Sequence, residues 1–146
     1  MKKDFTITLA IIFISMSLAT CSKTENENTT IYVDSENIDG PWDGSLTQPY
    51  QYIQDGIDAA ISGDTVFVFN GAYHENIIIN KSSVNVVAES KYSTILYGDT
   101  TYPIFSILES HVSIQNFTIK NTKSDGIGIK IGDFLLCTHA EIKNNI

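Results

Sequence analysis

The sequence predicts an all-β fold: a right-handed single-stranded parallel β-helix (solenoid) of about four coils with a short N-terminal capping helix. After one amphipathic stretch at about residues 50–62, the chain consists of short β-branched segments separated by polar turns, with no second helix. Short strands without helical crossovers between them suit a stacked solenoid better than a doubly wound sheet. The right hand follows from the strong preference of parallel crossover connections.

The capping helix is predicted from an apolar stripe. Ile53, Ile57 and Ile61 recur every four residues, which places them on one face of a helix. Pro49 fits a helix start, and Gly63 fits a stop because glycine readily adopts the left-handed conformation there. A helix of this length needs an apolar surface to cover, so we expect it to close the N-terminal end of the solenoid.

The predicted strands share β-branched and aromatic residues and are bounded by Asn, Gly and Ser, which turn the chain. They are Val66–Phe69, Ile77–Ile79, Val84–Val87, Thr94–Leu96, Ile104–Ile107, Val112–Ile114, Phe117–Ile119 and Ile127–Ile131. Corresponding strands of successive coils should stack in columns. The first predicted column, with uneven spacing along the chain, contains Val66/Val68, Val84/Val86, Val112/Ile114 and Ala140/Ile142. A second holds Ile77/Ile79, Ile95/Tyr97 and Phe117/Ile119, and a third holds Ile104/Phe105 and Ile127/Ile129.

The segment from Val112 to Asn121 resembles a coil of the pectin-lyase-like and NosD-type β-helix families, in which a two-residue bend containing Asn separates two strands. Here the bend is Gln115-Asn116, and Asn116 is expected to stack on an asparagine of a neighbouring coil. The alternative is a two-residue hairpin. The resemblance covers about residues 50–146 and implies a carbohydrate-associated protein, because related proteins include glycan lyases and hydrolases.

The N-terminus is typical of an export signal. Lys2 and Lys3 precede an almost uncharged segment from Phe5 to Leu18, too short for a comfortable membrane span. The tetrapeptide ending at Cys21 resembles a bacterial lipobox, which implies that Cys21 is the lipid attachment site. Plain secretory cleavage and an uncleaved anchor are the alternatives.

The predicted organisation is therefore a signal peptide over 1–20, a flexible polar tether over 21–30 and a β-helix domain over 31–146. The expected location is extracytoplasmic, as a lipoprotein of the outer membrane or cell surface. Ser22 rather than Asp follows the cysteine, which would favour the outer membrane in a Gram-negative cell.

The amino-acid composition limits the classes of partner that the protein is expected to bind. The formal net charge is −8, and removing the leader with Lys2, Lys3 and Asp4 makes it −9. No arginine is present, which argues against nucleic acid and anionic membrane surfaces as partners. Neutral sugars and polycations remain compatible. Cys137 follows an apolar run and is predicted to be a buried, inert thiol.

Two features near the start of the domain are candidate binding sites. The acidic loop 34–43 has oxygen ligands followed by Gly40, but its spacing does not match a full calcium loop. We therefore expect a solvated loop and no cofactor, with calcium as the weaker alternative. Trp42, with Tyr50 and Tyr52 nearby, is the candidate carbohydrate-binding residue, and cap packing is the alternative.

No catalytic residue or metal site is identified. His74, His111 and His139 are isolated in sequence and are expected to be turn histidines, although they could align on one face. Glycoside hydrolysis needs two carboxyl groups across one bond. The candidate carboxylates do not share a predicted strand face in any pair: they are Asp99, Glu109, Asp125 and Asp133. The sequence therefore favours a protein without enzymatic activity over an enzyme.

The segment from Ala140 to Ile146 has the pattern of the middle of a coil. The chain is therefore expected to be a fragment of a longer protein, or else to self-associate through an open last coil.

The leading hypothesis is a lipid-anchored surface β-helix that binds or scaffolds on a polysaccharide or cell-envelope glycan. The alternatives are the N-terminal part of a polysaccharide lyase or glycoside hydrolase, and a structural adhesin.

Overall fold

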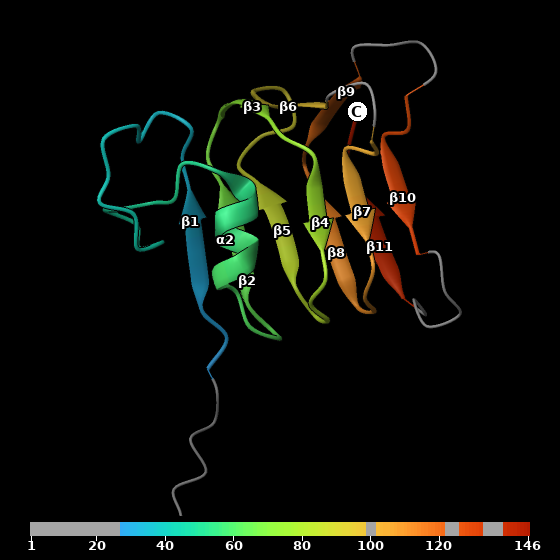
Figure 1. Cartoon of the computed structure of the whole chain (residues 1–146), viewed down its shortest axis with the longest axis horizontal. Helices are drawn as coiled ribbons and strands as arrows, with labels where there is room; N and C mark the ends of the chain where they lie inside the picture. The colour runs from blue at the N-terminus through green and yellow to red at the C-terminus, as the bar shows by residue number, and fades with distance from the viewer. Residues whose placement is uncertain (1–26, 99–101, 122–125, 133–138) are drawn as a thin grey trace, which may run out of the picture.

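Three parallel sheets wind around one apolar core in the computed structural model, which describes residues 27–98, 102–121, 126–132 and 139–146 (Figure 1). The long sheet contains β1 (Thr30–Val33), β2 (Thr65–Val68), β5 (Asn85–Ala88), β8 (Val112–Gln115) and β11 (Ala140–Lys143), in that order. The β3 sheet contains β3 (Gly71–His74), β6 (Thr94–Gly98) and β9 (Thr118–Asn121). The β4 sheet contains β4 (Ile77–Ile79), β7 (Phe105–Ile107) and β10 (Ile129–Ile131).

The predicted right-handed parallel β-helix is confirmed. Each of three successive coils contributes one strand to each sheet, with β1 before the first coil and β11 after the third. All pairings between the named strands are parallel. Every strand predicted between Val66 and Ile131 overlaps an observed one.

The core consists of the side chains that point inward from alternate strand positions. Val66, Val86 and Ile114 stack in register along the long sheet and are fully buried. From the other two sheets, Leu96 and Phe105 reach the same core and are also fully buried. Alternation along each strand therefore sends the next residues to the outer surface.

The first predicted column was partly wrong. Val66 pairs with Val86 of β5 and not with Val84, so the first step of the column is longer than predicted. The later steps are confirmed, because Val86 pairs with Ile114, and Ile114 pairs with Ile142.

The second predicted column was also wrong, in one strand and in one register. Ile95 pairs with Thr118 and not with Phe117, so the step from β6 to β9 is one residue longer than predicted. Ile77 and Ile79 pair with β7 of the β4 sheet, not with the column of β6. The strand that belongs beside β6 is β3, which was not predicted because Gly71-Ala72-Tyr73-His74 contains no β-branched residue.

The predicted bend begins one residue later, at Asn116, because Gln115 is the last residue of β8. It connects two sheets, so the hairpin alternative is wrong. β8 pairs with β5 and β11, whereas β9 pairs with β6. Asn116 and Asn144 both have positive φ, 64° and 55°. The Asn144 side-chain amide donates to Asn116 Oδ1 at 2.7 Å. The expected asparagine stack is therefore confirmed.

The capping helix is shorter than predicted. α2 spans Ile53–Ala59 rather than residues 50–62. Ile53 and Ile57 are fully buried, but Ile61 lies beyond the helix and is 44% exposed. α2 covers the first coil and contacts β1, β2 and β4. It approaches closely at Gly56, where an added Cβ would lie 2.8 Å from Val33 Cγ2.

Distant side chains fix both ends of α2. The Glu75 carboxylate accepts hydrogen bonds from Ile53 N at 2.9 Å and Gln54 N at 3.0 Å. Burial raises the pKa of Glu75, against the effect of these two N–H groups. At the other end, Lys81 Nζ donates to the carbonyl oxygens of Asp58 and Ala60. Such groups satisfy helix-end donors and acceptors that have no partner within the helix.

The outer edge of β1 is covered by the loop that follows it. Tyr32 N donates to Gly44 O at 2.8 Å, and Tyr50 N donates to Tyr32 O at 2.9 Å. Asp34 N donates to Tyr50 O at 2.8 Å. A paired edge does not recruit another strand, so this end of the long sheet is protected.

Candidate functional site

The outer face of the long sheet brings together aromatic and polar side chains from five strands. Strand register defines two parallel columns of outward positions, which we call the aromatic column and the polar column. The aromatic column contains Tyr32, Phe67, Val87, Gln115 and Lys143, and the polar column contains Thr30, Thr65, Asn85, Ser113 and Glu141. Successive positions in a column are about 4.8 Å apart.

Three aromatic rings touch at one end of this face. The ring centroids of Tyr32 and Phe67 are 6.0 Å apart in an edge arrangement, and those of Phe67 and Phe69 are 5.3 Å apart. Tyr32 and Phe69 stack at 6.0 Å. All three side chains are half-buried, so the cluster is packed but still reaches the surface. Pairs at these distances stabilise one another and hold the ring planes in place.

Unused hydrogen-bonding groups lie beside the rings. Among the residues that the structure describes, the Thr65 hydroxyl, the Asn85 amide and the Tyr32 hydroxyl have no hydrogen-bond partner. All three side chains lie on strands in regular register, which limits their movement. A ligand with hydroxyl groups could therefore bond to them without breaking an existing interaction.

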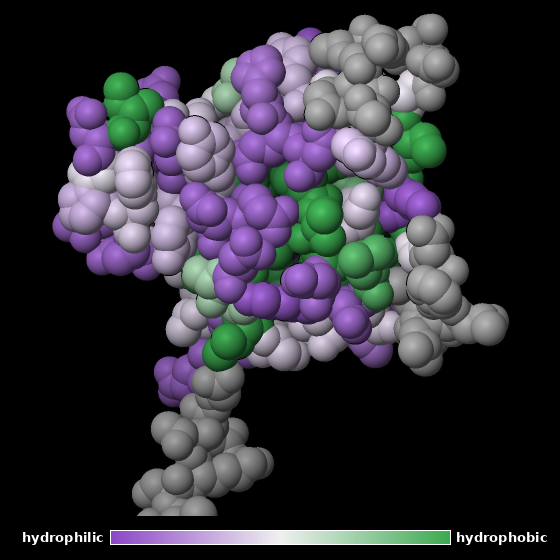
Figure 2. Space-filling view, in the orientation of Figure 1, coloured by the Kyte–Doolittle hydropathy of each residue, from purple (hydrophilic) through white to green (hydrophobic). Residues whose placement is uncertain are grey.

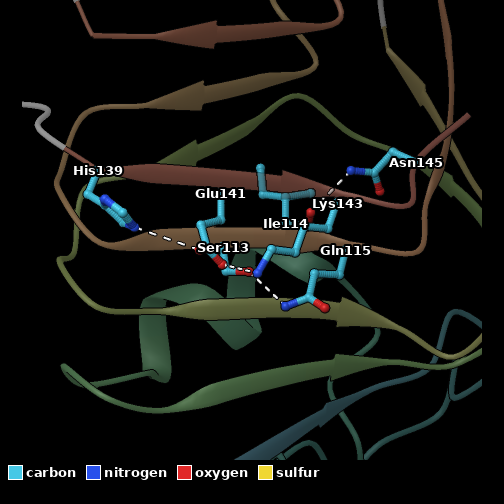
Figure 3. Close-up of polar contacts among 7 residues, drawn as sticks. All are labelled: Ser113, Ile114, Gln115, His139, Glu141, Lys143 and Asn145. Carbon is cyan, nitrogen blue, oxygen red and sulfur yellow. Dashed lines mark hydrogen bonds and ion pairs between the residues drawn. The ribbon is translucent and has the colours of Figure 1, made fainter.

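The other end of the face is a polar network, drawn in Figure 3. Gln115 Nε2 donates to Ser113 Oγ at 2.8 Å. Glu141 forms ion pairs with Lys143 and, at 3.7 Å, with His139. The Lys143 hydrogen bond and charge lower the pKa of the exposed Glu141 carboxyl. The single cation of the two columns is thus already matched by an anion.

The residues singled out from sequence lie elsewhere. Trp42 is 48% exposed, and its indole N–H donates to Asn37 O at 2.8 Å. Tyr52 is 51% exposed, whereas Tyr50 packs against the core. No ring contact joins Trp42 to either tyrosine among the described residues. The three therefore do not form one aromatic platform through direct contact.

The histidines are only partly brought together. His111 and His139 stack with centroids 5.7 Å apart, and His111 N donates to His139 O at 2.6 Å. His74 instead stacks on Tyr97 of the β3 sheet at 4.9 Å. No group of three or more metal-ligating side chains occurs within the described ranges. Cys21, Cys137, Asp99, Asp125 and Asp133 lie outside those ranges.

Two hollows and one apolar patch lie away from the long sheet. A shallow hollow of about 380 Å³ includes Lys81 and Glu109, but Lys81 is bonded to the end of α2. A smaller one of about 150 Å³ includes His74 and Glu75, whose carboxylate is likewise bonded to α2. Figure 2 shows apolar side chains gathered over β4 and β7, where Ile78 and Leu108 are each 49% exposed. None of these combines contacting rings with unused polar groups.

Sequence reasoning missed the aromatic cluster although a signal was present. In Thr65-Val-Phe-Val-Phe69 the valines alternate with phenylalanines. A strand with valine inward must place phenylalanine outward. The same phase in Ile31-Tyr-Val33 sends Tyr32 to the same side.

The fold and this face define the chain as a parallel β-helix protein with an aromatic and polar outer sheet. Its fold is similar to that of the pectin methylesterase PemA from Erwinia chrysanthemi, with a TM-score of 0.53 and 19% sequence identity. The match covers 65% of this chain and 31% of that one, so the chain spans about a third of that protein's length. No family model matches the sequence, and the curated proteins include no match. No helix among the described residues is long and apolar enough to cross a membrane.

Proposed function

We propose that this protein binds carbohydrate through the outer face of the long sheet and does so at the cell surface. The observation that carries the proposal is the contacting cluster of Tyr32, Phe67 and Phe69 beside a column of hydroxyl and amide side chains. The similarity to a pectin methylesterase fold supports a carbohydrate context for this architecture.

The chemistry of the two columns fits a sugar. A pyranose ring has apolar C–H faces and polar hydroxyl edges, so it needs an aromatic surface and hydrogen-bonding groups side by side. The aromatic column supplies the first through Tyr32 and Phe67, and the polar column supplies the second through Thr65 and Asn85. Both are held on a rigid sheet, which reduces the entropy lost on binding.

The shape of the face favours a polymer over a small molecule. Small-ligand sites are usually concave pockets of about 300–1,000 Å³, whereas the outer face of a sheet is open. Its five strands present five successive rows of side chains along the solenoid axis. An extended polysaccharide lying along that axis would meet one row after another.

Replacing Phe67 with alanine tests the proposal. We expect glycan affinity to fall by about tenfold or more, because the variant removes the ring shared by two of the three aromatic contacts; tenfold corresponds to about 1.4 kcal/mol. The measurement is retardation of the purified full chain in gels that contain soluble polysaccharides.

Two variants serve as comparisons, with circular dichroism to confirm folding. Tyr92→Ala, which removes a 75% exposed ring away from the two columns, should bind as the unmodified protein does. Loss of binding with Trp42→Ala but not with Phe67→Ala would move the site to loop 34–50 and contradict the proposal.

We further propose that Cys21 is lipidated and tethers the domain to the cell envelope. The supporting observation is the lipobox-like sequence that ends at Cys21, followed by a polar segment before β1. Cys21→Ala should move the protein from the membrane fraction to the soluble fraction. Unchanged membrane association would contradict lipid anchoring and leave the binding proposal intact.

A further inference from the structure

We infer that the glycan bound by the outer face of the long sheet is uncharged, and that acidic polysaccharides are excluded. This inference rests on the proposed function and adds the class of ligand. It starts from the charges of the two columns. In the rows of β1, β2, β5 and β8, neither column contains an ionisable acid or base other than the Tyr32 phenol. Asp34 and Glu89, which directly follow β1 and β5, are acids and not bases.

The one cation of the columns is not available to a ligand. Lys143 lies in the last row and is ion-paired with Glu141 of the same strand. A ligand carboxylate would have to displace Glu141, which would leave that anion without its partner. Breaking one charge pair to form another yields little net free energy at an exposed position.

The other lysines near this sheet are also engaged. Lys91 Nζ donates to Asn144 Oδ1 at 2.7 Å, and the lysine lies over the Tyr92 ring at 5.2 Å. Lys120 points from the β3 sheet and lies 5.9 Å from the Tyr97 ring centroid. Lys81 is bonded to carbonyl groups at the end of α2.

The electrostatic field of the whole protein also disfavours acidic ligands. The formal net charge is −8, and no arginine is available for bidentate carboxylate binding. An acidic polysaccharide carries one carboxylate on each of many residues, and each would lose hydration against aromatic and amide groups without gaining a cation. The negative field of the protein would also oppose its approach. A neutral chain incurs neither cost.

The test compares an acidic polymer with its esterified, uncharged form and with a neutral polymer of different sugars. The full chain is run in affinity gels with polygalacturonate, with the same polymer after methyl esterification of its carboxyl groups, and with a neutral glucomannan. We expect retardation by one or both uncharged polymers. Binding to polygalacturonate should be at least about tenfold weaker than to its esterified form. Affinity for uncharged polymers should not change between low and high salt, since no ion pair forms.

A gain-of-function variant tests the cause. Val87→Lys places a cation in the third row, beside Asn85 and next to the aromatic rings, at a half-buried outward position. It should acquire salt-sensitive binding to polygalacturonate. The matched control Val87→Gln adds a long polar side chain without charge and should not.

The outcomes separate the two proposals. Binding to no polymer would overturn the proposed function, and this inference with it. Binding to polygalacturonate as tight as to its esterified form, or tighter, would overturn the inference alone. Equal behaviour of Val87→Lys and Val87→Gln would show that a missing cation does not set the selectivity.

Discussion

Replacing Phe105 with alanine is expected to lower the free energy of unfolding by about 4 kcal/mol, within the range for buried aromatic side chains. Phe105 is fully buried, and its ring meets that of Phe117 edge-on at 5.7 Å. It lies in the middle coil, and its strand is paired on both sides. The cavity therefore cannot be filled by movement of an end of the solenoid. Urea denaturation followed by circular dichroism measures the change.

A smaller truncation and an outward residue provide the controls. Phe105→Leu should cost less than half as much, because most of the buried volume remains. Ile78→Ala, on the neighbouring strand β4 but 49% exposed, should cost about 1 kcal/mol or less. Equal losses for Ile78→Ala and Phe105→Ala would contradict the assignment of Phe105 to the core.

Replacing Asp64 with alanine is expected to cost about 3 kcal/mol, because two backbone donors lose a charged acceptor. Asp64 is 2% exposed. Its carboxylate accepts from Thr29 N at 2.8 Å and Ile61 N at 2.9 Å. It thereby joins the start of β1 to the turn after α2, which is distant in sequence. Asp39→Ala, in an exposed loop, should stay within about 0.5 kcal/mol of the unmodified protein.

The same carboxylate gives the domain an acid-sensitive component. Burial alone would raise the pKa of Asp64, but the Ile61 and Thr29 donors together with Lys81 outweigh it and lower the pKa below 3.8. Because the pKa of Asp64 is lower in the folded state, the ionised carboxylate stabilises the fold at pH values above its ordinary pKa. This stabilisation is lost as the pH falls through the folded-state pKa. Asp64→Asn should therefore show a smaller loss of stability between pH 4 and pH 2 than the unmodified protein. An identical pH slope for both would contradict this role.

The sequence predicted the strands better than their stacking. Alternation in Val66–Phe69 and Val112–Ile114 identifies inward residues because burial imposes a period of two. It does not say which strand lies over which, since the coils differ in length: β5 follows β2 after a shorter stretch of chain than β8 follows β5. The error over Ile77 and Ile79 has another cause: β3, the strand that pairs with β6, contains no β-branched residue and was not predicted.

The end of α2 and the aromatic cluster were missed for different reasons. Ile61 continues the helical period, but the chain leaves the helix at Ala60, where Asp64 and Lys81 bind the backbone. The Lys81 contact spans 21 residues, so it leaves no local sequence signal. The alternation of valine and phenylalanine in residues 65–69 indicates the aromatic cluster. The sequence prediction instead placed the carbohydrate site at Trp42, Tyr50 and Tyr52, because they lie close together in sequence. The location and the lipid anchor stay predictions.

The strict register of the long sheet separates the residues that fill the core from those that form the outer surface. Each row pairs an inward residue such as Val86, which fills the core, with outward neighbours such as Asn85 and Val87, which do not. An outward residue can therefore be exchanged in one row while the core and the other rows stay as they are. The chemistry of the outer surface can change one row at a time, by evolution or by design, without a new fold for each change.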